Sequence, residues 1–582
     1  MPGVFGFVKG IDAFSIKSMQ KAMSLYPSFK RDTIYEDEKI AASRVHLNKI
    51  GEKNSPYVLD DICVWVEGES YNVSELSNDF DLEIGTSFSK ALLINYQRGT
   101  LDSFLNRLDG YFCAVIYDRQ NSKLKLISDR YGMRMLYWYF HNEKFLWSSE
   151  VKGILALEGI DKTIDSASFN CFMELGHLLG TSTWFDKIKL INPASILSFD
   201  LITKEVSQHH YWTWAEILPS SLKFDEAVDE LGKRFIRAVE RRFSPTERIG
   251  VTLSGGLDSR AIVAAIDHLS SNFCGQAFTF GIEGCDDIEI ARQVIEKTKW
   301  RHKCYHFTDD NWFKPRIQKV WNTDGMKDMM HMHGGEFVDD MATHVDVNLN
   351  GYLGDAIFGG SYIPHKEHID KRIDRETAEK FYKLHDVETF YQSKFFDINH
   401  IDPYLFMSRG RRFINMGTVN SLVSLEQRKP FMDNECVELI YSLPDHFRVN
   451  NKLYSTMLQR FFPDFFKNIP WQQTGKPAGE TPQWNLYNRL LKKFHRLFIN
   501  FSGGQNKNNY TNYKNWILTN ETKSYLSGLL KREQSEYSKL TLDDLKAKYL
   551  DVHGSDCDKS REVLRAATIE LYLKLLNKNN CE

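Results

Sequence analysis

Short apolar or alternating runs fill the first 210 residues of the chain, and turn-forming residues separate them. The runs include Tyr111–Tyr117, Lys123–Ile127 and Met135–Phe140, which are bounded by Asp, Asn and Gly. Alternation of apolar and polar residues between such turns is typical of antiparallel strands. The pattern therefore predicts an antiparallel sheet domain over residues 1–210, with a linker over 207–221.

A different rhythm begins at residue 222, where helical and strand-like segments alternate. Helices are predicted over 224–243, over 260–266 and from Asp286 onward. Buried strands are predicted over 248–253, 276–281, 303–307 and 345–350. This alternation is typical of a doubly wound parallel α/β sheet, which we expect over residues 222–480.

The rest of the chain is mainly helical in pattern from about residue 370. A flexible loop is predicted over Gly503–Asn515, which opens with Gly-Gly-Gln-Asn-Lys-Asn-Asn. An amphipathic helix is predicted over Arg561–Leu576. Residues 481–582 are therefore expected to form a helical C-terminal extension.

Length and composition narrow the class of protein. A chain of 582 residues is too long for one core, and its 42% apolar and 26% charged residues are typical of a globular protein. Lys plus Arg number 74 and Asp plus Glu 77, so nothing indicates the basic face that a nucleic-acid partner requires. No apolar run approaches the roughly 18 residues needed to span a membrane. The nine cysteines form no CxxC pair, so we expect reduced thiols in a cytoplasmic protein.

The segment Ser254-Gly-Gly-Leu-Asp-Ser259 carries the strongest chemical signal. It lies directly between a predicted strand and a predicted helix, where glycines let backbone N–H groups approach an anion and the helix N-terminus favours negative charge. Asp258 would repel a phosphate unless a metal intervened, so its presence points to Mg²⁺ between carboxylate and phosphates. No lysine follows the glycines, so this is not the loop of the enzymes that transfer a γ-phosphate.

This hexapeptide resembles the pyrophosphate loop of the ATP pyrophosphatases, and the sequence over residues 1–480 resembles the family of asparagine synthetases and β-lactam synthetases. The resemblance implies that ATP is cleaved between its α and β phosphates to adenylate a carboxylate. It also implies an α+β, Ntn-hydrolase-type glutaminase-like sandwich over residues 1–210 and an α/β synthetase domain over residues 222–480. The implied nucleotide-binding residues are Ser254, Gly255, Gly256, Leu257, Asp258, Ser259, Thr279, Gly281 and Gly354.

Two later segments resemble further signatures of this family. Asn350-Gly-Tyr-Leu-Gly-Asp-Ala-Ile-Phe-Gly-Gly360 implies that Asp355 joins Asp258 in holding Mg²⁺. Gly475-Lys-Pro477 implies that Lys476 stabilises the negative charge that builds up during the reaction, for which a mobile cation is suited.

A third segment, Leu425-Glu-Gln-Arg-Lys-Pro-Phe-Met-Asp433, implies that Glu426 assists a base. The structural alternative is an ion pair of Glu426 with Arg428 or Lys429.

Residue 352 separates branches of the resembled family. Asparagine synthetases have Glu at the matching position, whereas β-lactam and carbapenam synthetases have Tyr, which pairs with a Glu to deprotonate an amine. Since the unperturbed pKa of a tyrosine is about 10, Tyr352 needs a carboxylate partner to act as a base, and Glu426 is the expected partner. A buried tyrosine that contacts a carbonyl is the alternative.

The adenine site is less clearly marked. Thr279-Phe-Gly281 resembles the strand whose backbone contacts the base in this family. The acids at 286, 287 and 289 fit such a site or the acidic first turn of an ordinary helix. His331-Met-His333 has the spacing of a metal pair, but no third ligand is evident, and a helical core or surface is expected instead.

The N-terminal part resembles a glutaminase domain through Glu67-Gly-Glu-Ser-Tyr-Asn72, Leu108–Ala114, Ser128–Gly132 and Phe145–Lys152. Active members have Cys at the second position, whereas this chain has Pro2, which has no thiol to form a thioester. The residue that usually holds the oxyanion is Asn, and its match here, Glu67, is negatively charged. The resemblance therefore implies a domain without glutaminase activity.

These observations predict an ATP-dependent, AMP-forming amide ligase with ATP and Mg²⁺ as cofactors. Its substrates are expected to be a small-molecule or peptide carboxylate and an amine, as in β-lactam synthetases or lasso-peptide cyclases. Two alternatives stay open: an ammonia-dependent asparagine synthetase and a non-catalytic nucleotide-binding partner protein. Relatives often form dimers, so the resemblance leaves a homodimer open, and no nucleic-acid or membrane partner is expected.

Overall fold

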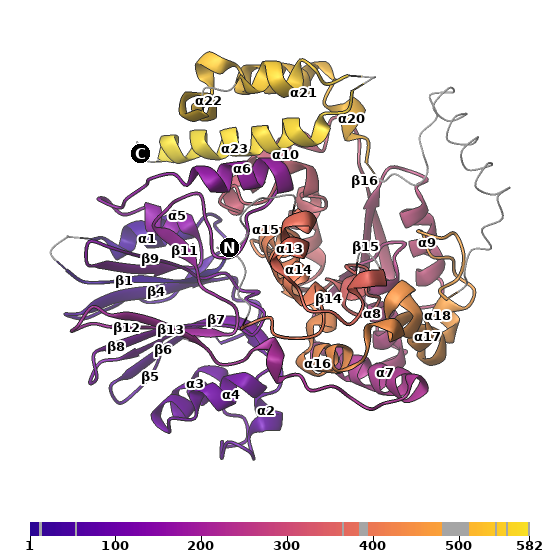
Figure 1. Cartoon of the computed structure of the whole chain (residues 1–582), viewed down its shortest axis with the longest axis horizontal. Coiled ribbons are helices and arrows are strands. Elements are labelled where there is room, and N and C mark those ends of the chain that lie inside the picture. The colour runs from indigo at the N-terminus through magenta and orange to yellow at the C-terminus, as the bar shows by residue number, and fades with distance from the viewer. Residues whose placement is uncertain are drawn as a thin grey trace.

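Three β-sheets form the frame of the chain in a computed structural model (Figure 1). The structure describes residues 1–10, 14–52, 55–363, 366–382, 394–479, 511–541, 544–554 and 557–579. Two antiparallel sheets belong to the N-terminal part, and one parallel sheet lies beyond residue 248.

The two antiparallel sheets pack face to face. The first has the order β11-β9-β10-β1-β4-β2, with β3 on β4; its strands are β1 Gly3–Val8, β2 Lys30–Arg31, β3 Tyr35–Glu36, β4 Ile40–His46, β9 Tyr137–His141, β10 Lys144–Ser148 and β11 Ile188–Leu190. The second has the order β13-β12-β8-β7-β6-β5; its strands are β5 Tyr57–Leu59, β6 Ile62–Ser70, β7 Gly110–Asp118, β8 Lys123–Ser128, β12 Ser195–Asp200 and β13 Val206–His210. Val4 and Trp147 of the first sheet meet Trp65 and Val115 of the second in one buried cluster.

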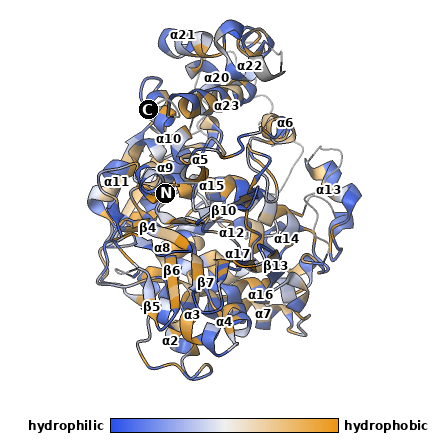
Figure 2. Ribbon diagram, turned by 90° about the vertical axis from the view of Figure 1, so that its left-hand side faces the viewer, coloured by the Kyte–Doolittle hydropathy of each residue, from blue (hydrophilic) through white to orange (hydrophobic). Residues whose placement is uncertain are grey.

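Helices cover the outer faces of this sandwich. Helices α1 (Ile16–Met23) and α5 (Val151–Leu155) lie on the first sheet, and α3 (Phe88–Gln97) lies on the second. Strands β6 and β7 are apolar over much of their length because both of their faces are covered (Figure 2).

The parallel sheet has the order β16-β15-β14-β17-β18. Its strands are β14 Ile249–Thr252, β15 Gln276–Gly281, β16 Arg301–His306, β17 Val347–Leu349 and β18 Glu426–Arg428. The helices between them are α8 Leu257–Leu269, α9 Asp286–Ile295, α10 Phe313–Asn322 and α11 Val338–His344, and α7 (Phe224–Glu240) precedes the sheet. The spacing of apolar residues along α7 buries Val228, Leu231 and Phe235 on one face.

The predicted fold class is confirmed: an α+β sandwich is followed by a doubly wound parallel sheet and a mainly helical C-terminal part. The predicted linker is partly wrong, because Val206–His210 pairs with β12 as an edge strand. Strand β18 was not predicted, since Glu426-Gln-Arg428 contains no apolar side chain. Of the predicted loop at 503–515, residues 503–510 lie outside the described part, and Tyr513–Trp516 is helix α20.

The C-terminal helices bridge both parts of the chain. Helix α23 (Ser560–Asn579) packs on α6 (Ser166–Leu175) of the N-terminal part and on α10 beside the parallel sheet (Figure 1). Apolar packing is also continuous from β6 and β7 into α7 and α8. The boundaries at 210, 222 and 480 stay predictions. None of the described helices is long and apolar enough to cross a membrane.

Buried arginines join the sandwich to the parallel-sheet part. Arg242, which follows α7, donates to Asp433 at 2.8 Å and to Asp109 of the N-terminal part at 2.6 Å. Its guanidinium carbon lies 4.3 Å from the ring centroid of Tyr71. Because both acids are buried with it, removal of the arginine would leave Asp109 without its cation and Asp433 with Arg241 alone, at 3.3 Å.

We expect Arg242→Met to lower the free energy of unfolding by about 3–5 kcal/mol, because it breaks a buried ion pair on one side only. Arg237→Met, in the preceding helix α7, is the matched control; Arg237 pairs with Glu75 at the surface, and its removal should cost about 0.5 kcal/mol or less. Thermal or denaturant unfolding measures both. Equal stability of the two variants would contradict the assigned role of Arg242.

Candidate functional site

The Ser254–Ser259 loop joins β14 to α8 at the carboxyl edge of the parallel sheet. The Ser254 N–H donates to Ser259 Oγ at 3.0 Å, and the Gly256 N–H donates to Ser254 Oγ at 3.2 Å. The two serines therefore close the turn that begins the helix. The Gly255 N–H donates to Asp287 of α9 at 2.8 Å, so one of the three predicted acids of α9 contacts the loop directly.

Asp258 of this loop lies next to Asp355, which belongs to the segment after β17. The backbone N–H of Asp355 donates to Asp258 Oδ2 at 3.0 Å, and the hydroxyl of Tyr454 in α17 (Lys452–Phe461) donates to Oδ1 at 2.9 Å. Burial, and then the charge of Asp355, raise the pKa of Asp258 well above its usual range. Among the described residues, no Lys, Arg or His forms an ion pair with either acid. Two adjacent carboxylates without a basic partner fit a divalent cation.

The glycines of the Asn350–Gly360 segment have a steric role. Strands β14 and β17 are neighbours, so the loops that follow them meet. A Cβ on Gly351 would lie 2.6 Å from Asp258 Cβ, and a Cβ on Gly354 would lie 2.5 Å from Asp258 Cγ. The two glycines thus allow Asp355 to approach Asp258.

The segment with Lys476 docks on the same loop. Trp471 and Lys476 close a short hairpin, in which the Trp471 N–H donates to the Lys476 carbonyl at 2.8 Å. The neighbouring Gln472 N–H donates to the Gly255 carbonyl at 3.3 Å, and Arg260 donates to the carbonyls of Gly255 and Pro470 at 3.1 and 2.8 Å. The backbone of Lys476 is thereby held near the loop, while its side chain is half-buried.

Tyr352 and Glu426 do not form the expected pair in this structure. Tyr352 is 4% exposed, and its hydroxyl has no hydrogen-bond partner among the described residues. Glu426 instead accepts from Arg134 of the N-terminal part at 2.6 Å, and Arg134 also lies 3.7 Å from Glu67. The alternative ion pair of Glu426 with Arg428 or Lys429 is not formed either, because Arg428 pairs with Glu69 and Glu247.

Lys429 is the residue that sequence reasoning missed. Its Nζ lies 4.9 Å from the ring centroid of Tyr352 and donates to Asn415 Oδ1 at 2.5 Å. No carboxylate pairs with it among the described residues, and burial, reinforced by Arg134, lowers its pKa to about 7. The sequence signal for it is a lysine directly before the apolar Pro-Phe-Met run, which predicts no more than an ion-pair partner.

The expected adenine-site residues hold the sheet together. Thr279 Oγ1 donates to the Leu253 carbonyl at 2.8 Å, and the Gly281 carbonyl accepts from the Phe307 N–H at 3.0 Å. Both residues lie at the carboxyl end of β15, beside the Ser254–Ser259 loop. His331 and His333 do not converge on one point: their Nδ1 atoms lie 2.6 Å from Asp328 Oδ1 and 2.7 Å from the Tyr513 hydroxyl.

Glu67, the residue expected at the oxyanion position of the N-terminal part, is a buried acid. Glu67 lies on β6, and burial, with a contribution from Glu426 and against the effect of Arg134, raises its pKa to about 7. On the neighbouring strand, burial raises the pKa of the Cys113 thiol to about 12, so this cysteine is not a reactive thiolate.

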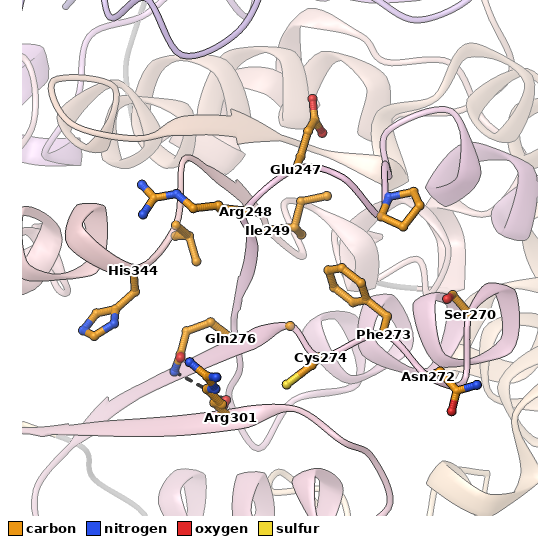
Figure 3. A pocket seen from close by; sticks show the side chains of 13 residues that line it. Glu247, Arg248, Ile249, Ser270, Asn272, Phe273, Cys274, Gln276, Arg301 and His344 are labelled. Atoms are coloured by element: carbon orange, nitrogen blue, oxygen red, sulfur yellow. Dashed lines mark hydrogen bonds between the residues drawn. The ribbon is translucent and has the colours of Figure 1, made fainter.

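A separate cavity of about 550 Å³ opens at the opposite edge of the parallel sheet (Figure 3). It is lined by Arg248, Gln276, Arg301 and His344 among others, and by none of the predicted site residues. Since ligands of parallel α/β sheets bind at the carboxyl ends of the strands, the Asp258–Asp355 edge remains the candidate site.

Comparison with known proteins also divides the chain into an N-terminal part and a parallel-sheet part. Residues 230–469 match the asparagine synthase family, and residues 1–212 match the glutamine amidotransferase domain. A putative glutamine-hydrolysing asparagine synthetase 2 of Methanocaldococcus jannaschii is 28% identical over 310 residues, which is 52% of this chain and 60% of the relative. A probable asparagine synthetase of Acanthamoeba polyphaga mimivirus is 28% identical over 50% of this chain and 49% of its own length. Asparagine synthetase 3 of Bacillus subtilis is 24% identical over 72% of this chain and 77% of its own length.

We expect Lys429→Met to raise the melting temperature more at pH 6 than at pH 9, relative to the native protein. With a pKa of about 7 in the folded state, Lys429 is a buried charge below pH 7 and is neutral above it. Native stability should therefore gain up to about 1.4 kcal/mol per pH unit above pH 7 relative to the variant. Thermal unfolding across this range tests it. Lys467→Met, at an exposed lysine, should show no such trend, and a pH-independent difference for Lys429→Met would contradict the low pKa.

Proposed function

Since the chain belongs to the asparagine synthetase family, we propose that it is an ATP-dependent ligase that activates a carboxylate and joins it to an amine. The observation that carries this proposal is the pair of half-buried acids, Asp258 of the Ser254–Ser259 loop and the neighbouring Asp355, whose backbone N–H donates to Asp258. The loop and the two acids lie together at the carboxyl edge of the parallel sheet, where such sheets bind ligands.

The residues of the loop and the acids would divide the binding of MgATP between them. The loop glycines and the N-terminus of α8 would bind the pyrophosphate part, and Thr279 and Gly281, at the carboxyl end of β15, would recognise the base. Asp258 and Asp355 would hold Mg²⁺, which when bound neutralises phosphate charge. Lys476, on the hairpin docked at Gly255, would stabilise charge at the reacting phosphate or carbonyl.

Tyr352 is the proposed group that takes the proton from the attacking amine. Glu426 is not its partner in this structure, because Arg134 already pairs with that carboxylate, and the Lys429 Nζ lies over the Tyr352 ring instead. The positive charge of Arg411 opposes the effect of burial on the Tyr352 pKa and so favours the phenolate. A tyrosine in place of glutamate supports an organic amine rather than ammonia as the nucleophile.

The relatives are named glutamine-hydrolysing asparagine synthetases, which favours one alternative, an asparagine synthetase; in this chain it would take ammonia in place of glutamine. A protein that binds the nucleotide without turnover is the second alternative. One assay separates all three.

We expect release of AMP and pyrophosphate from MgATP with an amino-acid-derived or peptide acid that also supplies an amine, and none with aspartate and ammonium. Asp258→Asn should lower the rate about a hundredfold or more, since it removes one of two metal ligands. Asp309→Asn, at an exposed acid, is the control and should retain activity. Release with aspartate and ammonium would favour the asparagine synthetase, and MgATP binding without AMP would favour the non-catalytic partner.

We also expect that glutamine is not hydrolysed. Pro2 offers no thiol, and Glu67 places a carboxyl group where an oxyanion would form. Glutamate release from glutamine measures this, with the Bacillus subtilis relative as the active control. Steady glutamate production by this chain would contradict the proposal for the N-terminal part.

A further inference from the structure

Basic side chains gather beside Tyr352 on the carboxyl side of the parallel sheet. A π-helical segment, η6 (Phe406–Ile414), carries Arg409 and Gly410 there. A Cβ on Gly410 would lie 3.3 Å from the Tyr352 hydroxyl and 2.7 Å from Leu353 Cδ1. The helical turn with Arg409 therefore touches the loop that carries Asp355, and π-helical turns occur frequently at functional sites.

Arg409 extends from this turn into solvent without an acidic partner. Its guanidinium carbon lies 5.7 Å from the ring centroid of Tyr362 and 5.8 Å from that of Phe413. Tyr362 belongs to the loop after Asp355, in which the Ser361 N–H donates to the Asp355 carbonyl at 3.2 Å. Arg409 is exposed, and no carboxylate pairs with it in the part of the chain that the structure describes.

A second segment brings further basic groups to the same place. Lys327 is buried, with its Nζ 3.6 Å from the ring centroid of Phe413 and 2.9 Å from the Phe413 carbonyl. The His331 ring lies 4.8 Å from the Phe413 ring, and its side chain is 32% exposed. Gly334 of this segment packs on Phe280 at the carboxyl end of β15, so the segment lies above the edge of the sheet that holds the candidate site.

The charges of this cluster do not balance. Asp328 is the acid beside it, and that carboxylate is already engaged by His331 at 2.6 Å and lies 3.7 Å from Arg565. Lys327 forms its hydrogen bond with a carbonyl, which carries no charge. Burial lowers the pKa of Lys327 to about 8 and Arg409 adds to this, against the effect of Asp328, which shows that the two cations repel each other. Arg409 and Lys327 thus bring more positive charge to this place than Asp328 offsets, and such an excess favours the binding of an anion.

We propose that Arg409, together with His331 and Lys327, binds a carboxylate of the acid substrate other than the carboxylate that is activated. The planar guanidinium suits a carboxylate because it can donate two parallel hydrogen bonds. The aromatic rings of Tyr362 and Phe413 hold its stem and restrict its position. This inference rests on the proposed function, and it limits the acid substrates to those with a second anionic group.

The cluster could in principle serve a phosphate of the nucleotide, and a binding experiment distinguishes the two. Glutarate and succinate, with two carboxylates, and butyrate, with one, are titrated into the protein with Mg²⁺ and α,β-methylene-ATP. We expect glutarate or succinate to bind more tightly than butyrate to the native protein. Arg409→Met should weaken that binding about tenfold or more and leave the affinity for the nucleotide unchanged.

Two variants serve as controls. Arg301→Met removes an exposed arginine at the opposite edge of the sheet and should change neither affinity (Figure 3). Arg409→Lys keeps the positive charge but lacks the two parallel N–H donors of a guanidinium. Its affinity for the dicarboxylates should therefore lie between those of the native protein and Arg409→Met. Because Arg409 is exposed, its variants should keep the native melting temperature.

Three results would overturn the inference. The first is that neither dicarboxylate binds better than butyrate to the native protein, and the second is that Arg409→Met binds both as the native protein does. The third is loss of α,β-methylene-ATP binding in Arg409→Met, which would assign the arginine to the nucleotide. A failure of the proposed function shows separately, as native protein that releases no AMP from MgATP with any acid.

Discussion

The junction between the N-terminal part and the parallel-sheet part depends on the oxygen atoms that accept hydrogen bonds from buried arginines. A guanidinium carries a charge at every ordinary pH and has five N–H donors, so burial requires several oxygen atoms in fixed places. Arg242 finds two carboxylates, and Arg428 finds Glu69 and Glu247. Arg411 and Arg412 of η6 donate to backbone carbonyls of the N-terminal part at 2.6 to 2.9 Å, and Arg412 also donates to Met326 Sδ at 3.7 Å. Each of these arginines thus joins a residue of the parallel-sheet part to the N-terminal part.

The elements around the candidate site could be predicted because local patterns determine them. Strand β15 begins and ends at the expected residues, and α8 follows the glycine turn, since an apolar run and a glycine pair are features of neighbouring residues. Strand β18 has no such pattern. Its residues Glu426 and Arg428 are buried because arginine and glutamate partners from other segments neutralise them, and partners hundreds of residues away leave no local trace.

The candidate site also contains some contacts that the local sequence indicates and others that depend on distant segments. The approach of Asp355 to Asp258 depends on two glycines within one motif, and the resemblance of that motif to a family signature indicated it. The partner of Tyr352 could not be deduced, because the choice between Glu426 and Lys429 depends on Arg134, which the N-terminal part inserts at this point. The cluster of Arg409, Lys327 and His331 likewise combines segments about 80 residues apart, and only packing brings them together.

The loop over residues 129–134 limits how this chain can change during evolution. The Asp129 carboxylate accepts the N–H groups of Tyr131, Met133 and Arg134 and so gives the loop its shape. Asn415 and Arg411 donate to the carbonyls of Met133 and Gly132 from the other side. Truncation of the first 210 residues would expose Glu426, Lys429 and several arginines at once. Stepwise evolutionary loss of the N-terminal part would therefore uncover buried charges beside the candidate site, whether or not this part acts on glutamine.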